Sequence, residues 1–530
     1  MLIAALLAGA ASPLAAQQAA APAPAPQAAI AAPTKSVPPS SPEAKRLYTH
    51  VATLSDDAMR GREAGTPDFD RAAAYVADQF KAIGATPAGT DGWYQPVPLV
   101  AYRLKAPTQL SIVDGGKVTP LTLGTDFISG GTGGKARSEV EAQVVYVGQG
   151  IYAPKDGVDD YAGVDVRGKI VAFAIGAPES LQGEMRAHMQ SITSKALEAK
   201  RRGAIGVSVL LPQGFDLADA ANSWQEPQVT WRTPEGQAFS AHGLPGVGAL
   251  SPAMALRLFG ADAKPGTVSK AKLRSVSEAQ NAPLESRNVV ALLPGSDPAL
   301  KNEYVVLTAH LDHVGVGDPV NGDAIYNGAM DNSVGVGSMI EAGRALKAAG
   351  HKRPILLVAL TAEEKGLVGS DYFARHPVVP IGNIVADVNL DMPIITYPFT
   401  DMFAFGADRS SLGPLVKAAL QPLGITLTPD PDPSQALFVR SDHYSFIKQG
   451  VPSLFLKTGF AGAGAEATKL FRSTHYHKPS DTIALPIDWE SGGKFIRANT
   501  AIAKAIADAP QRPSWNAGDY FGETFGKPAN

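Results

Sequence analysis

The second half of the chain alternates apolar runs of strand length with helical patterns, and no other feature restricts its fold as strongly. The apolar runs are, in order, VVALLPG, YVVLTAH, PILLVALTAEE, NIVADVNLDM, DMFAFG and VPSLFLKTG. Segments with helical spacing, such as SVGVGSMIEAGRALKAAG, lie between them. Near-continuous apolar strands that alternate with helices indicate a mostly parallel sheet with helices on both faces. We therefore expect an α/β fold here.

The chain has 530 residues, which is too long for one ordinary core, so we expect two folded units. Residues 42–105 begin with helical spacing and should join residues 286–510 in the α/β domain. Residues 106–285 contain short β-like runs broken by Gly, Pro and Asp, which predict an inserted, mostly β domain with little helix. Residues 511–530 should form a C-terminal tail.

The first residues, MLIAALLAGAASPLAAQ, form an apolar run that ends in small residues, as a secretory signal peptide does. We expect residues 1–16 to direct export to a bacterial periplasm or the exterior. The run is too short to span a bilayer, and no Lys or Arg precedes Lys35. Either the true start lies upstream, or the run is a hydrophobic tail without export function. Residues 17–41 are rich in Ala and Pro and predict an extended linker.

The composition excludes several kinds of site and partner. A formal net charge of −3 gives no reason to expect nucleic acid or an acidic membrane surface as a partner. The chain contains no cysteine, so disulfides, thiolate metal sites and cysteine nucleophiles are excluded. Nothing in the composition predicts an oligomeric state.

Five polar residues end or follow the β-favouring runs. They are His310, Asp331, Glu364, Asp391 and His477. The loops at the carboxyl ends of parallel strands hold the active site in such sheets. Two imidazoles and three carboxylates suit a pair of divalent cations that activate water for hydrolysis. Each residue alone also fits a solvated strand end or a helix cap, but their order and spacing together predict a dinuclear metal site.

Neighbouring residues have roles that the sequence leaves partly open. Asp312, two residues after the first of the five, could bond the second ring nitrogen of that histidine. Glu363 and Glu364 should point in different directions, so one can bind metal while the other reaches the attacking water. His475 stands beside His477, which leaves open which of the two is the ligand.

Six blocks of the sequence resemble, in order, those of the co-catalytic zinc exopeptidases: AHLDHVG, YNGAMDNSVG, EEKGLVGS, NLDM, RSDHYSF and YHKPSDT. This family contains secreted bacterial aminopeptidases related to glutamate carboxypeptidase II and the transferrin receptor ectodomain. The segment DYAGVDVRGKIVAF resembles the protease-associated domain that is often inserted at this place. The resemblance implies a zinc exopeptidase-like fold with two zinc ions per chain, for which Co or Mn could substitute.

The resemblance also implies how the metals are held. One metal would be bound by His310 and Asp391, the other by Glu364 and His477, with Asp331 bridging the two. Asp312 would be the partner of His310.

The remaining matched residues would take part in catalysis. Glu363 would be the general base, Tyr476 would donate a hydrogen bond to the tetrahedral oxyanion, and Arg440 would bind the substrate's carbonyl or the intermediate. Asp442 and His443 also match a block, but their position at a helix start favours capping and packing.

The expected activity is the hydrolytic removal of N-terminal residues from peptides, because Glu363 and Asp391 would face a free N-terminal ammonium. A carboxypeptidase or an amidohydrolase on acylated amino acids would need a cluster of Arg and Lys, of which only Arg440 is obvious. A catalytically silent binding ectodomain would have lost ligands. A single-metal relative, such as a glutaminyl cyclase, would not need the complete set with Asp331.

Overall fold

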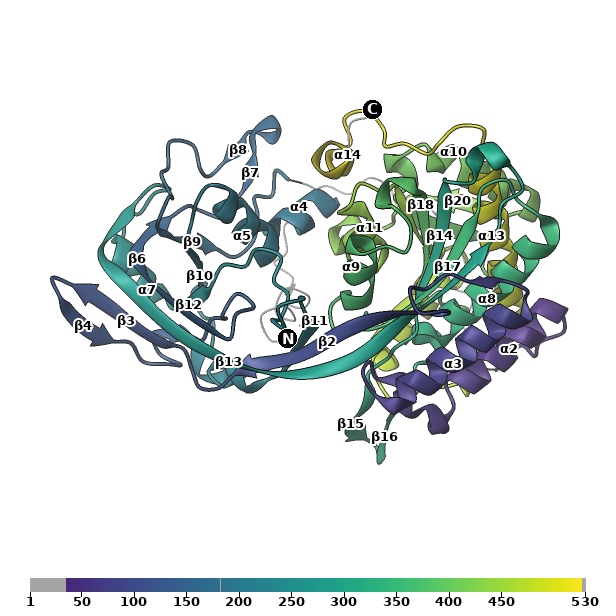
Figure 1. Cartoon of the computed structure of the whole chain (residues 1–530), viewed down its shortest axis with the longest axis horizontal. Coiled ribbons are helices and arrows are strands. Elements are labelled where there is room, and N and C mark those ends of the chain that lie inside the picture. Colours follow the sequence, from purple (N-terminus) through teal and green to yellow (C-terminus); the bar gives the residue numbers. More distant parts are fainter. Residues whose placement is uncertain (1–34, 182, 527–530) are drawn as a thin grey trace. The chain divides into compact units, whose positions relative to one another are not determined.

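The structure of the protein is a computed structural model that describes residues 35–181 and 183–526. The described chain divides into two compact units (Figure 1). The β unit comprises residues 99–284, and the α/β unit comprises the described residues up to Pro98 and from Glu285 onward. The expected signal peptide and most of the expected linker lie outside the described residues. The first crossing between units falls inside a strand, β2 (Tyr94–Leu104), where no break in sequence pattern marks it.

The α/β unit is built on a mixed, mostly parallel sheet. Its strands are β1 (Thr86–Pro87), the end of β13 (Val268–Leu293), β14 (Tyr304–His310), β17 (Ile355–Leu360), β18 (Ile384–Leu390), β19 (Asp401–Phe405), β20 (Thr426–Thr428) and β21 (Ser453–Thr458). The order across the sheet is β1-β13-β17-β14-β18-β21-β19-β20. The four central strands, β17, β14, β18 and β21, are parallel and almost entirely buried, as their continuous apolar sequences predict.

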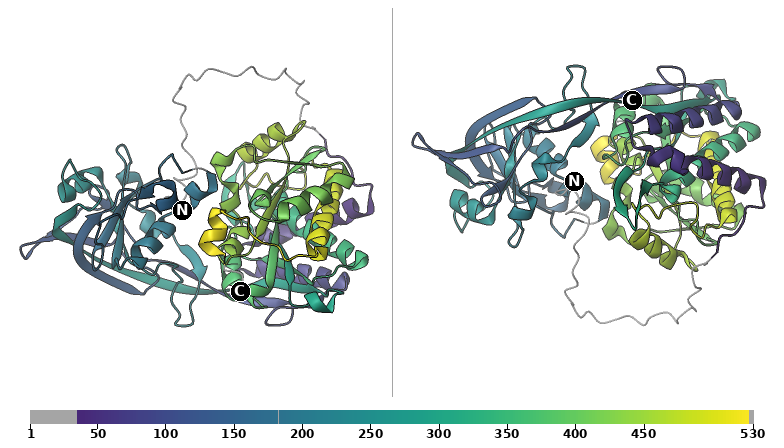
Figure 2. Two further views of the ribbon diagram at one scale, coloured as in Figure 1. Left: turned by 90° about the horizontal axis from the view of Figure 1, so that it is seen from above. Right: turned by 90° about the horizontal axis from the view of Figure 1, so that it is seen from below.

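Helices cover both faces of this sheet (Figure 1). One layer contains α2 (Pro42–Leu54), α8 (Val334–Ala349), α10 (Leu412–Leu420) and α13 (Trp489–Asp508). The other contains α9 (Val368–Arg375) and α11 (His443–Ile447). The helices α2 and α13 are far apart in sequence but lie side by side (Figure 2). The expected α/β fold is therefore confirmed.

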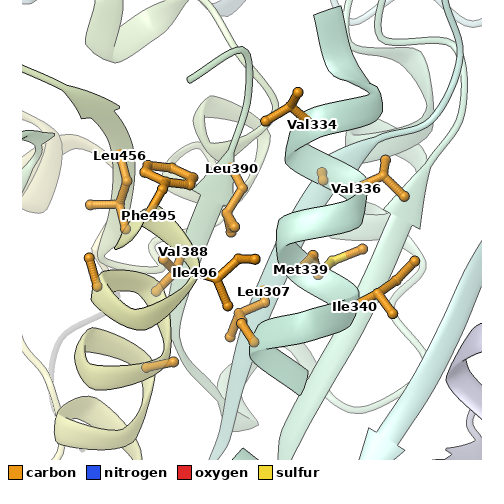
Figure 3. Packing of buried hydrophobic residues seen from close by; sticks show 14 of the residues in the cluster. Leu307, Val334, Val336, Met339, Ile340, Val388, Leu390, Leu456, Phe495 and Ile496 are labelled. Atoms are coloured by element: carbon orange, nitrogen blue, oxygen red, sulfur yellow. The ribbon is translucent and has the colours of Figure 1, made fainter. Parts of the chain in front are cut away.

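Apolar side chains join the layer of α8 and α13 to the sheet beneath it. Met339 from α8, Ile496 from α13 and Leu307 from β14 are fully buried in the same cluster (Figure 3). Burying an aliphatic or aromatic side chain of this size contributes about 1.5–3 kcal/mol each. This packing holds the central strands, and hence the loops at their carboxyl ends, in fixed positions.

The N-terminal helical region is interrupted, which the sequence did not reveal. A 3-10 turn (Asp57–Arg62) separates α2 from α3 (Pro67–Ala82). Gly61 has a φ of 69°, and a Cβ there would lie 2.4 Å from the carbonyl oxygen of Tyr326, so only glycine fits. The fully buried guanidinium of Arg62 donates hydrogen bonds to the carbonyl oxygens of Leu54, Leu311, Asn327 and Gly328. The turn thus joins the first helices to the loops after β14 and before α8.

The β unit has its own sheet and its own cores. Besides the start of β13, the strands of this sheet are β3 (Gln109–Asp114), β4 (Lys117–Pro120), β5 (Phe127–Ile128), β6 (Arg137–Tyr146), β9 (Ile170–Ala174), β10 (Gly206–Leu210) and β12 (Gly246–Leu250). They follow the order β4-β3-β13-β6-β9-β10-β12-β5. Its helices include α4 (Gly183–Gln190), α5 (Ile192–Arg201), α6 (Leu217–Ala220) and α7 (Pro252–Phe259), so the unit has more helix than its sequence indicated.

The segment after residue 510 packs on the α/β unit as far as residue 526. Its helix α14 (Tyr520–Phe525) buries Phe521, whose ring lies 5.3 Å from that of Phe438. Trp515 Nε1 donates to the carbonyl oxygen of Gly450 at 2.9 Å. Among the described residues, no helix is both long and apolar enough to cross a membrane.

Candidate metal centre

The carboxyl ends of three parallel strands bring most of the expected ligands together. His310 is the last residue of β14, Glu364 follows β17, and Asp391 directly follows β18. β14 lies between β17 and β18, with His310 opposite Leu360, so the three strands end side by side. The other two ligands come from loops. Asp331 precedes α8, and His477 follows α12 (Gly464–Thr474).

His310, Asp331 and Asp391 form a first group of side chains that could hold a metal ion. His310 Nε2 lies 3.3 Å from Asp331 Oδ1 and 3.3 Å from Asp391 Oδ1. Donors bound tetrahedrally to zinc at 2.0–2.1 Å are about 3.3 Å apart. Both distances from His310 therefore match the spacing of donors around a tetrahedral cation.

A second group contains Asp331 again, together with His313, Glu364 and His477. His477 Nε2 lies 3.0 Å from Glu364 Oε2 and 3.3 Å from Asp331 Oδ2. The Asp331 carboxylate thus presents Oδ1 to His310 and Oδ2 to His477. One carboxylate shared in this way can bridge two cations. His477 rather than His475 belongs to the centre, because His475 Nδ1 instead contacts Ser480 Oγ at 3.0 Å.

His313 belongs to the second group, and sequence reasoning gave it no role. Its imidazole is fully buried, and Nδ1 lies 2.7 Å from Glu364 Oε1 and 4.0 Å from Asp331 Oδ2. The contact with Oε1 fixes the rotation of the Glu364 carboxylate, so that Oε2 faces His477. The ring lies against Gly328, where a Cβ would be only 2.6 Å away. The one signal in the sequence was a second histidine in the block AHLDHVG.

Hydrogen bonds from residues outside the two groups hold the ligands in place. The carboxylate of Asp481 accepts the backbone N–H groups of Met330 and Asp331 at 2.9 and 3.0 Å. Ser441 Oγ donates to Asp391 Oδ2 at 2.5 Å. These partners were also not singled out from the sequence, although Asp481 lies in the block YHKPSDT and Ser441 in RSDHYSF.

Asp312 supports the centre differently from what the sequence suggested. The second ring nitrogen of His310, Nδ1, contacts the backbone carbonyl oxygen of Asp312 at 3.1 Å, not its carboxylate. The carboxylate is directed elsewhere and accepts the backbone N–H groups of Glu363 and Glu364 at 3.1 and 3.2 Å. Asp312 therefore fixes both the tautomer of His310 and the turn that presents the two glutamates.

The carboxylates create a strongly negative environment. Burial alone would lower the pKa of both histidines, but neighbouring carboxylates raise the pKa of His310 well above its usual range and that of His477 to about 10. Burial raises the pKa of Glu363 well above its usual range, and the nearby Glu364 and Asp391 raise it further. These raised pKa values reflect an excess of negative charge among the buried carboxylates. Divalent cations bound between them would compensate this negative charge.

The expected catalytic residues border the two groups. Glu363 is partly exposed, next to the ligand Glu364. The ring of Tyr476 stacks on that of His477 with centroids 3.8 Å apart and is 40% exposed. Arg440 is exposed, and it interacts electrostatically with Arg472 and Tyr476.

Of the two residues at the start of α11, His443 has the expected packing role, but Asp442 does not have the expected capping role. His443 packs as expected, since its ring stacks on Phe455 and Nε2 contacts the carbonyl oxygen of Phe438 at 2.8 Å. The capping role expected for Asp442 is wrong, because its side chain makes no cap bond to α11. Its backbone is already helical, with φ −53° and ψ −34°, whereas a capping side chain needs an extended backbone.

Comparisons with known proteins find sequence similarity to peptidases. Residues 288–503 match the model of Peptidase family M28. A probable leucine aminopeptidase 2 from Aspergillus oryzae is 31% identical over 189 residues, which are 34% of this chain and 35% of that protein. A leucine aminopeptidase 2 from Trichophyton rubrum is 29% identical over 236 residues, 42% of this chain and 44% of the other. The chain thus spans less than half the length of these curated relatives.

Solved structures with similar folds include an aminopeptidase from Aneurinibacillus sp. strain AM-1 and a zinc aminopeptidase from Bacillus subtilis. The first has a TM-score of 0.48 and 21% identity, over 88% of this chain and 95% of that one. The second has a TM-score of 0.42 and 19% identity, over 90% and 96%. The family match covers every residue of the two metal-holding groups. The similarity to Peptidase family M28 therefore lies in residues 288–503, within the α/β unit.

Proposed function

We propose that the protein is a metal-dependent aminopeptidase that binds two zinc ions and removes N-terminal residues from peptides. The observation that carries this proposal is the position of Asp331, whose two oxygens face the imidazoles of two different ligand groups. Such a bridged pair of sites is suited to hydrolysis. The names of the curated relatives, which are leucine aminopeptidases, support the direction of cleavage.

The donor set fits zinc. His310, Asp331 and Asp391 would hold one ion, and Asp331, Glu364 and His477 the other, with His313 orienting Glu364. All donors are nitrogen or oxygen, so Co or Mn could replace zinc. A bound pair of cations supplies Lewis-acid activation of water and of the substrate's carbonyl group.

Three of the chain's own residues would transfer the proton of the attacking water and stabilise the negative charge of the tetrahedral intermediate. Glu363 accepts the proton of the attacking water and passes it to the leaving amine, because it lies at the centre without belonging to either ligand group. Tyr476, next to His477, donates its phenolic proton in a hydrogen bond to the oxyanion. Arg440, which interacts electrostatically with Tyr476, adds positive charge near that residue.

A carboxypeptidase is the second candidate, and a specific observation favours it. The buried ammonium of Lys457 interacts electrostatically with Asp391, and Arg472 is close to Arg440, so more cations lie near the centre than the sequence made obvious. We favour the aminopeptidase, because Glu363 and Asp391 provide negative charge for a free N-terminal ammonium.

The two candidates are separated by blocking one end of the substrate. We expect hydrolysis of aminoacyl p-nitroanilides, loss of this activity with a chelator and its recovery with zinc. N-acetylation of a peptide should abolish cleavage, whereas amidation of its C-terminus should have little effect. Release of C-terminal residues from N-acetylated peptides would instead establish the carboxypeptidase.

We also propose that the protein acts after export and that residues 106–285 form a protease-associated-like domain. The apolar run at the start of the chain supports export. Mass spectrometry of the protein from the periplasm or the medium should find a new N-terminus near residue 16. Full-length protein confined to the cytoplasm would contradict export.

A further inference from the structure

A cavity of about 470 Å³ lies next to the metal centre within the α/β unit. Met392, one of its lining residues, directly follows the ligand Asp391. Most of the wall is apolar and includes the rings of Phe403, Phe405 and Phe460. This size and lining are typical of small-molecule sites, so the cavity has room for a substrate's side chain.

Lys457 introduces a positive charge into this apolar wall. The residue is only 8% exposed, and its Nζ lies 4.8 Å from the centre of the Phe455 ring. Within the described part of the chain, its ammonium group donates one hydrogen bond, to the carbonyl oxygen of Met392 at 3.0 Å. An ammonium group has three N–H donors, so two are available to a molecule in the cavity.

The other charged residues of the wall leave the cavity positive. Lys457, Lys469 and Arg472 are cationic, against two aspartates. The carboxylate of Asp432 is already bonded by Ser434 and Gln435 in its own turn. A buried ammonium with spare donors favours an anionic ligand over an apolar one, because an apolar side chain would cover the charge without replacing its water.

We propose that this cavity receives the side chain of the substrate's N-terminal residue and that Lys457 selects a carboxylate there, so that N-terminal Glu and Asp are preferred. The proposal rests on the aminopeptidase function above. The methylene groups of Glu would contact the aromatic wall while its carboxylate reaches Lys457. A C-terminal carboxylate has the same chemistry and is the alternative source of the charge.

Comparison of Glu with Gln isolates the charge, because the two side chains have nearly the same shape. We expect kcat/KM for the p-nitroanilide of Glu to exceed that of Gln by 10-fold or more. Lys457→Met should lower this Glu-to-Gln ratio by about 10- to 100-fold, the usual range for a lost charged hydrogen bond. Lys457→Gln, which keeps a donor for Met392, should lower the ratio similarly and serves if the Met variant does not fold.

Lys494→Met is the matched control. Lys494 also donates to a backbone oxygen, that of Phe399 at 2.8 Å, and lies over an aromatic ring, but it does not line the cavity. The ratio of kcat/KM for the Glu and Gln substrates should be the same in Lys494→Met as in the wild type. A wild-type ratio near one, or equal ratios in the wild type and both Lys457 variants, would overturn the proposal while leaving the aminopeptidase intact. Cleavage of N-acetylated peptides only when their C-terminus is free would overturn the aminopeptidase itself and assign Lys457 to the C-terminal carboxylate.

Discussion

Glu363 and Glu364 are neighbours in the sequence but have different surroundings. The Glu364 carboxylate contacts His313 and His477 through its two oxygens. Glu363 belongs to neither ligand group, and burial among other carboxylates raises its pKa. Two adjacent glutamates thus have the surroundings expected of a metal ligand and of a proton acceptor, and the Asp312 carboxylate accepts both of their backbone N–H groups.

Glu363→Gln should therefore abolish proton transfer but leave the metals. The substitution keeps the shape of the side chain and removes its ability to accept a proton. We expect kcat to fall by about two to four orders of magnitude. Metal content, measured by atomic absorption, should stay near two per chain. Glu364→Gln is the control and should lose one metal, and the reverse pattern would mean that the two roles are exchanged.

Asp481 supports the candidate centre without belonging to either group of metal-holding residues. Its carboxylate holds the backbone of the loop that carries Asp331. In Asp481→Asn, the amide group of the new side chain faces an N–H donor, so one of the two bonds is lost. Metal affinity, measured by titration with a competing chelator, should weaken by about 10- to 100-fold. Unchanged affinity with reduced stability would assign Asp481 a purely structural role.

At the residue scale, the sequence indicated the five expected ligands because each follows a recognisable strand or loop block. It could not indicate His313, Asp481 or Arg62. Their roles depend on which atom they meet across the fold, and residue type alone does not specify a partner. His313, for example, is a ligand candidate only because Glu364, 51 residues away, follows the neighbouring strand.

At the scale of elements, α2 and α8 are joined by a buried ionic cluster. Glu341 of α8 is contacted by Arg46 and His50 of α2, at 2.5 and 3.2 Å, and by Arg344 at 3.1 Å. Burial alone would raise the pKa of this carboxyl, but these hydrogen bonds lower it from 4.5 to about 2. Ionisation of this carboxyl group therefore stabilises the folded state relative to the unfolded state.

Glu341→Gln should accordingly destabilise the protein in a pH-dependent way. The depressed pKa corresponds to about 2–3 kcal/mol of stability, present above pH 4.5 and lost as pH falls towards 2. Denaturant unfolding at pH 7, 4 and 3 should show a difference between wild type and variant that narrows at the acidic end. Arg497→Gln, at an exposed ion pair with Glu43, should have little effect at any pH. A constant difference for Glu341→Gln would contradict the ionic origin.

The elements themselves were predicted unevenly. Long apolar strands and α8 or α13 were recognisable because their periodicity is strong over many residues. The break at Gly61 was not, because it depends on a close approach to the distant carbonyl oxygen of Tyr326. The hairpin of β15 (Gly315–Val320) and β16 (Asp323–Tyr326) was also missed, since its strands are largely exposed and lack an apolar pattern.

At the scale of the whole molecule, the candidate centre depends on one unit only. Both groups of metal-holding residues found in the described chain lie in the α/β unit, and that unit has its own core. The β unit also has cores of its own. Strand β2 enters it, and β13 leaves it. Before the first crossing, the carbonyl oxygen of Trp93 accepts a hydrogen bond from Val290 N at 2.8 Å. The two chain segments that flank the β unit are thus hydrogen-bonded to each other within the α/β unit.

Replacing residues 99–284 with a short Gly/Ser linker should therefore preserve the metal centre. We expect zinc binding equal to that of the full chain and retained hydrolysis of aminoacyl p-nitroanilides, because no donor is removed. If the β unit limits access to substrates, the kcat/KM of the shortened protein should change more for long peptides than for dipeptides, as measured over a series of increasing length. A folded variant, verified by circular dichroism, that loses zinc would show that the β unit supports the centre. Equal loss for short and long substrates with zinc retained would exclude a role in selecting substrates by length.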